Sequence, residues 1–141
     1  MKWFKKRVEE EEEEFKLPSH PLLIAVDFDG TCVEKAYPDI GKTKAGAVET
    51  LKALVLRDHK LILWTCREDC EERNYLAEAV AWFEENGIEV AGINQTPEDI
   101  DFRKGGGRKA YADVYIDDSI IGGFPGWARI HYQFTGQPLI I

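Results

Sequence analysis

The sequence predicts an α/β fold, a Rossmann-like three-layer sandwich with a mainly parallel sheet. Short apolar runs alternate with longer amphipathic stretches between Leu22 and Ile116. Strands separated by helices of this length need right-handed crossovers, which place the strands parallel in one sheet. Polar residues follow three of the four apolar runs, as expected where parallel strands end at one ligand-binding edge.

The elements can be assigned in order along the chain. Residues 22–26 are all apolar and precede Asp27, which is typical of a strand buried on both faces. A helix is expected at about residues 44–57, because its apolar residues fall on one stripe. Further strands are expected at residues 61–64, 89–93 and 113–116, a second helix at 71–86 with Gly87 after it, and a helical turn plus an edge segment in the last 20 or so residues.

The chain has 141 residues, which fits one domain. Residues 1–20 form a charged N-terminal tail in which four basic residues precede the six glutamates of residues 9–14. Blocks of like charge usually stay solvated, so we expect a flexible tail followed by a single domain at residues 21–141.

Composition excludes several classes of function. The net charge of −8 argues against a nucleic-acid partner, because affinity for a polyphosphate depends on basic side chains. No apolar stretch is long enough for a membrane span, and glutamates stand where a signal peptide would have its apolar segment. The cysteines, Cys32, Cys66 and Cys70, are odd in number and form no C-x-x-C pair, so we expect a reducing, cytoplasmic setting.

The segment Asp27-Phe28-Asp29-Gly30-Thr31 is the most informative part of the chain. A regular strand would point Asp27 and Asp29 to opposite faces, so the two carboxylates converge only if the chain bends there. Gly30 makes such a bend easy. Two buried anions held close together need a compensating cation or proton, which predicts a site for a hard divalent metal.

Two other strand ends add to this pattern. Thr65 follows the second predicted strand, and Asp117 and Asp118 follow the fourth. A single Asp is a common turn residue or helix cap. Because the carboxyl ends of parallel strands lie at one edge, we expect all three groups to meet there.

These residues resemble the motifs of the haloacid dehalogenase (HAD) superfamily of phosphohydrolases. The sequence VDFDGT (residues 26–31) is similar to its first motif, the strand ending in Thr65 to its second, and YIDDS (residues 115–119) to its fourth. The resemblance spans residues 22–120, and Bacteroides-type HAD hydrolases of unknown substrate look similar over the whole domain. It implies a cap-less phosphatase, because neither the roughly twelve-residue segment after Thr31 nor the roughly twenty-residue segment after Ile93 could hold a folded cap.

The resemblance also implies roles for individual residues. Asp27 would be the nucleophile that forms an aspartyl phosphate, and Asp29 the general acid and then the base. Thr65 would bind a phosphoryl oxygen. The implied cofactor is Mg²⁺, held by Asp27, the backbone carbonyl of Asp29, and Asp118 with Asp117 in support. Substrate contacts are expected from Gly30, Thr31, Cys66 and Arg67, and for Arg67 an ordinary ion pair with Glu68 or Asp69 is the alternative.

A phosphate-binding cation is expected from the third motif of the family. Lys109 is our choice, eight residues before Asp117, with Lys104 as the second candidate and Arg108 as a neighbour. The alternative for all three is a solvated basic loop. Asn94, after the third strand, is a further candidate for contact with substrate.

The prediction is therefore a Mg²⁺-dependent phosphohydrolase that cleaves a phosphate monoester, with a small phosphorylated metabolite as substrate. Asp29 favours an ester over a halide, because a halide leaves without protonation. A phosphatase acting on nucleic-acid ends or on a phosphoprotein is one alternative, supported by the basic stretch at residues 103–109. A non-catalytic HAD-fold binding domain is another, and a second subunit could complete an open site.

Overall fold

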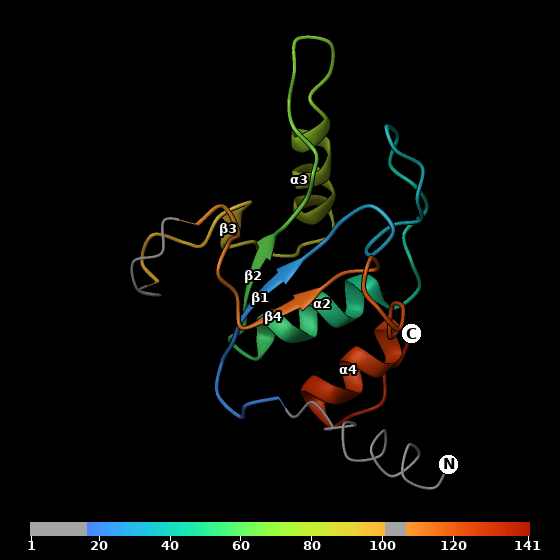
Figure 1. Cartoon of the computed structure of the whole chain (residues 1–141). Coiled ribbons are helices and arrows are strands. Elements are labelled where there is room, and N and C mark those ends of the chain that lie inside the picture. The colour runs from blue at the N-terminus through green and yellow to red at the C-terminus, as the bar shows by residue number, and fades with distance from the viewer. Residues whose placement is uncertain (1–16, 101–106) are drawn as a thin grey trace, which may run out of the picture.

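The computed structural model describes residues 17–100 and 107–141. Its sheet has four parallel strands in the order β3-β2-β1-β4 (Figure 1). The strands are β1 (Leu23–Val26), β2 (Lys60–Leu63), β3 (Gly92–Ile93) and β4 (Val114–Ile116). The predicted α/β class with a parallel sheet is confirmed, and β1, the strand that precedes the acidic motif, lies between two neighbours.

All three described helices lie on one face of the sheet. These helices are α2 (Ala47–Leu56), α3 (Tyr75–Glu85) and α4 (Trp127–Thr135). Ile24 and Val26 of β1 point toward them, together with Leu61 and Leu63 of β2. Right-handed crossovers from β1 to β2 and from β2 to β3 run in the same direction, so α2 and α3 cover the same face.

The second face of the sheet is covered differently. Leu23, Ala25 and Ile62 pack there in a smaller cluster with Ala112 and Ile100. These last two residues belong to the connection that returns from β3 across the sheet to β4. Within the described ranges this connection contains no helix, so the second layer of the domain is made of loop segments.

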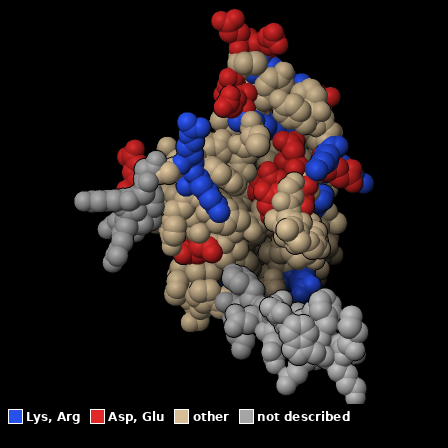
Figure 2. Space-filling model, viewed as in Figure 1, with Lys and Arg blue, Asp and Glu red and all other residues tan. Residues whose placement is uncertain are grey.

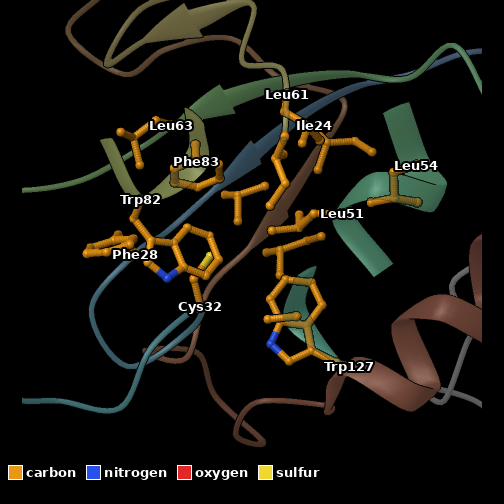
Figure 3. Close-up of a cluster of buried hydrophobic side chains, with 14 of the residues drawn as sticks. Ile24, Phe28, Cys32, Leu51, Leu54, Leu61, Leu63, Trp82, Phe83 and Trp127 are labelled. Carbon is orange, nitrogen blue, oxygen red and sulfur yellow. The ribbon is translucent and has the colours of Figure 1, made fainter. Parts of the chain in front are cut away.

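The core contains a group of aromatic side chains that includes Phe28, which lies between Asp27 and Asp29 in the sequence (Figure 3). The ring centroid of Phe28 lies 5.6 Å from that of Trp82 and 6.1 Å from that of Phe83. The indole N–H of Trp127 donates a hydrogen bond of 2.8 Å to the carbonyl of Thr31. Packing against α3 and α4 therefore fixes the backbone of the turn that carries Asp27 and Asp29.

Several element boundaries differ from the sequence prediction. The third strand, expected at residues 89–93, is only Gly92–Ile93, and the first helix begins at Ala47 rather than near residue 44. The second helix begins at Tyr75 rather than near residue 71, because Asp69 and Asn74 form a β-bridge that closes the preceding loop. The C-terminal segment forms the helix α4 instead of a single turn, and the described residues after it contain no edge strand. Trp127 and Ile130, three residues apart, are buried on one side of α4, which packs against α2.

Within residues 17–100 and 107–141, none of the helices combines the length and the apolar character that a membrane span needs. Lys104 and the N-terminal tail up to residue 16 lie outside the described residues. The predictions made for them remain predictions.

Candidate functional site

The chain bends sharply directly after β1, as the sequence predicts. The amide N–H groups of Thr31 and Cys32 both bond to the carbonyl of Phe28, at 3.1 and 2.9 Å. Gly30 has a φ of 87°, a left-handed conformation that costs glycine little. A Cβ at this position would lie 2.5 Å from Oδ2 of Asp118, so glycine also allows the fourth strand's carboxylate to approach.

Three carboxylates from two strand ends gather at this bend. One oxygen each from Asp27, Asp117 and Asp118 lie within 4.8 Å of one another. The hydroxyl of Thr31 lies between two of them, 2.9 Å from Oδ2 of Asp27 and 3.1 Å from Oδ1 of Asp118. This acidic triad could hold a metal ion, and a set of carboxylate oxygens suits a hard divalent cation.

Thr31 organises the triad from below. Its side chain is fully buried, and its oxygen also accepts a 3.0 Å hydrogen bond from the backbone N–H of Asp118. Gly30 and Thr31 thus lie at the base of the site, where Thr31 orients the carboxylates. Their predicted contact with substrate remains a prediction.

The carboxylates of the triad affect one another strongly. Burial, and then the hydrogen bond with Asp118, raise the pKa of Asp27 to about 7. Burial acts in the same direction on Asp118, but hydrogen bonds from Asp27, Thr31 and Lys35 outweigh it and lower the pKa of that carboxyl. Asp27 is therefore the carboxyl of this pair that retains a proton more readily, and a divalent cation would take the place of that proton.

This arrangement predicts that cation binding depends on pH. A raised pKa means that the folded protein holds a proton which the unfolded chain releases. The contribution of this proton to the free energy of unfolding is complete below pH 3.8, the pKa of this carboxyl in the unfolded chain. It is lost as the pH rises through about 7, the pKa in the folded protein. A divalent cation at the triad would have to displace this proton, so any rise in melting temperature on addition of Mg²⁺ should be smaller at pH 5.5 than at pH 8. Differential scanning fluorimetry would measure it.

Two variants complete this experiment. Asp27→Asn has no proton to displace at this position, so its response to Mg²⁺ should be weaker and nearly independent of pH. Asp99→Asn removes an exposed carboxylate that pairs with Lys60 and should behave like the wild type. An equal response of the wild type at both pH values would contradict the raised pKa of Asp27.

Arg67 holds the second aspartate of the motif. Its Nε and Nη2 lie 2.7 Å from Oδ2 and Oδ1 of Asp29, so the guanidinium binds both carboxylate oxygens. Its remaining N–H groups donate to the carbonyls of Pro38, Asp39 and Tyr75 at 3.0–3.3 Å. The side chain is only 1% exposed. Arg67 does form an ion pair, but with Asp29 instead of its sequence neighbours Glu68 and Asp69.

A cavity of about 550 Å³ opens above these groups. Figure 2 shows acidic side chains gathered on this face of the molecule, with basic side chains directly beside them. The structure brings together in the cavity wall seven predicted site residues: Asp27, Asp29, Thr65, Cys66, Arg67, Asp117 and Asp118. Three further residues of the wall, Lys35, Tyr37 and Ser119, were not predicted.

Among the residues that the structure describes, Lys35 lines this cavity and Lys109 does not. Its Nζ lies 3.3 Å from Oδ2 of Asp118. Lys109 places its Nζ 4.5 Å from the ring centroid of Tyr115, which packs on the second face of the sheet. Lys35 carries no sequence signal, because it lies in an exposed polar loop with neither periodicity nor a recognisable motif.

Thr65 is positioned by Asn94. The backbone N–H of Thr65 donates a 2.8 Å hydrogen bond to Oδ1 of Asn94, which itself has a left-handed φ of 53°. The hydroxyl of Thr65 accepts a hydrogen bond from the backbone N–H of Arg67. Asn94, considered from the sequence as a substrate contact, therefore fixes the end of β2 in this structure.

The fold has a counterpart among solved structures. A conserved protein from Bacteroides thetaiotaomicron superposes with a TM-score of 0.73 and 41% sequence identity, covering 83% of this chain and 92% of that chain. The chain belongs to the family of this conserved Bacteroides protein. No family model matches the sequence, and no curated protein matches it.

Membership of this conserved Bacteroides family supports the fold over most of the chain. The site itself consists of the acidic triad, the Asp29–Arg67 pair and Lys35.

Proposed function

We propose that the protein is a Mg²⁺-dependent phosphohydrolase of the HAD superfamily, cleaving a phosphate monoester through an aspartyl phosphate on Asp27. The observation that carries this proposal is the acidic triad, in which Asp27 from the end of β1 meets Asp117 and Asp118 from the end of β4 in an open cavity. A shared metal ion is the simplest reason for a fold to collect three carboxylates in this way. A small phosphorylated metabolite fits a cavity of this size.

The chain's own residues supply most of the proposed reaction. A carboxylate oxygen of Asp27 attacks phosphorus, and the bond from phosphorus to the leaving oxygen breaks. Water then attacks the phosphorus, the bond to Asp27 breaks and inorganic phosphate leaves. Mg²⁺ bound to the triad would neutralise the phosphate charge and keep Asp27 ionised.

Asp29 is the proposed proton donor to the leaving oxygen and the proton acceptor for the attacking water. Arg67 binds both oxygens of Asp29 in the absence of substrate. Each proton transfer therefore requires one of these two hydrogen bonds to open. Thr65, in the cavity wall, is the proposed hydrogen-bond donor to a phosphoryl oxygen.

The test is the release of phosphate from 4-nitrophenyl phosphate and from acetyl phosphate, with added Mg²⁺ and with EDTA. We expect release that depends on Mg²⁺ for both compounds. Absence of release over a broad panel of phosphate esters would favour the non-catalytic binding domain instead.

Lys35 is expected to supply the cationic group that the sequence argument assigned to Lys109. The transition state spreads negative charge over the phosphoryl oxygens, and Lys35 is in the cavity wall. Lys35→Met should lower kcat/KM for 4-nitrophenyl phosphate by about 10²-fold, the usual effect of removing one such group. Lys109→Met is the matched variant and should change kcat/KM little. The reverse order of effects would return the role to Lys109.

A further inference from the structure

The loop at residues 34–42 is exposed, yet a buried side chain anchors it. Residues 34–39 are all exposed, and Figure 1 shows the loops after β1 and β2 projecting from the end of the sheet where these strands finish. Arg67 donates hydrogen bonds to the carbonyls of Pro38 and Asp39, at 3.2 and 3.0 Å. At the base of the loop, the N–H of Glu34 bonds to the carbonyl of Lys42. The loop therefore has a fixed position relative to the cavity.

Tyr37 is the part of this loop that the proposed reaction does not use. It lines the cavity although 61% of its surface is exposed. Its ring centroid lies 5.1 Å from Cζ of Arg67, which lies 5.4 Å from the ring centroid of Phe28. The ring of Tyr75 is 5.8 Å away at an angle of 37°. The guanidinium of Arg67 and the ring of Tyr75 thus hold the Tyr37 side chain in place, although most of its surface is exposed to solvent.

Lys35 and Tyr37 reach the same cavity from one loop, two residues apart. Lys35 contacts Asp118 of the triad, where the phosphate would bind, and Tyr37 lines the same cavity. An exposed aromatic ring that is already held in place can stack against a planar group of a ligand with little loss of conformational entropy.

We propose that Tyr37 forms the subsite for the leaving group and that the site takes phosphate monoesters whose leaving group carries a flat, unsaturated ring. This inference rests on the proposed function, because it takes the acidic triad as the place of the phosphate. It adds the chemical class of the substrate and the residue that recognises it.

The test compares two phosphonates that cannot be hydrolysed. Phenylphosphonate and methylphosphonate share the anionic head and differ in the ring, and titration calorimetry in the presence of Mg²⁺ gives both dissociation constants. We expect phenylphosphonate to bind about three- to tenfold more tightly to the wild type, in line with the strength of aromatic pairs. Tyr37→Ala should remove this preference, and Tyr37→Phe should retain it.

Tyr132→Ala is the matched control, because Tyr132 is an equally exposed tyrosine (59%) on α4, away from the cavity wall. It should leave the preference unchanged. The subsite is refuted if the wild type does not prefer the ring, if the preference survives in Tyr37→Ala, or if neither phosphonate binds. A preference that depends on Tyr37, in a protein that releases no phosphate from any ester, would refute the hydrolase and its leaving group, and would show that Tyr37 binds the ring of a ligand that is not cleaved.

Discussion

Asp27→Asn is expected to abolish the Mg²⁺-dependent release of phosphate, with a fall in kcat of at least about 10³-fold, since removing the nucleophile removes the covalent route. The variant should nevertheless be folded, and without metal it should be at least as stable as the wild type near neutral pH. The reason is that an amide replaces a partly buried carboxyl whose pKa burial and Asp118 raise to about 7. Initial rates of phosphate release and a urea unfolding curve on the same preparation measure both effects.

Asp99→Asn is the control for this variant, because it makes the same chemical change at an exposed carboxylate paired with Lys60. It should keep the wild-type rate. Phosphate release by Asp27→Asn at the wild-type rate would refute the assignment of the nucleophile, whatever the identity of the substrate.

Arg67→Met is expected to cause the largest loss of stability, about 3–5 kcal/mol in the free energy of unfolding. The buried guanidinium pairs with both oxygens of Asp29 and satisfies the carbonyls of Pro38, Asp39 and Tyr75. Methionine fills a similar volume but leaves a partly buried carboxylate and three carbonyl groups without this donor. Urea denaturation measures the loss, and the slope of the transition shows whether unfolding remains two-state.

Two comparisons distinguish this pair from an ordinary ion pair. Arg73→Met removes an arginine that bonds Glu78 and Asp39 at the surface, and its effect should be much smaller. The double variant Asp29→Asn/Arg67→Met should be more stable than the sum of the single changes predicts, because the buried charge and its partner are lost together. A loss for Arg67→Met no greater than that for Arg73→Met would contradict this account.

Much of the site could be predicted because parallel strands end at a common edge. That rule alone brings Asp27 together with Asp117 and Asp118, although some ninety residues separate them in the sequence. The bend at Gly30 was predictable for a similar reason, since a regular strand could not bring Asp27 and Asp29 to the same side.

The rest depends on the paths of the loops, which carry no periodic pattern. Arg67 has Glu68 and Asp69 as its nearest carboxylates in the sequence, and only the three-dimensional course of the chain shows that it pairs with Asp29. Lys35 was missed because a lysine in an exposed polar loop is usually solvated. The helix α4 was underestimated because glycine and proline directly precede it and polar residues interrupt its short apolar stripe.

The contacts of Arg67 have a further consequence for how the protein moves. The surface loop at residues 34–42 is bonded to a side chain that also holds the end of β1 and the start of α3. Releasing this loop would take the carbonyls of Pro38 and Asp39 away from a buried guanidinium, so the loop should open less readily than an unanchored surface loop. A substrate would therefore bind to a cavity whose wall is already formed in the folded protein.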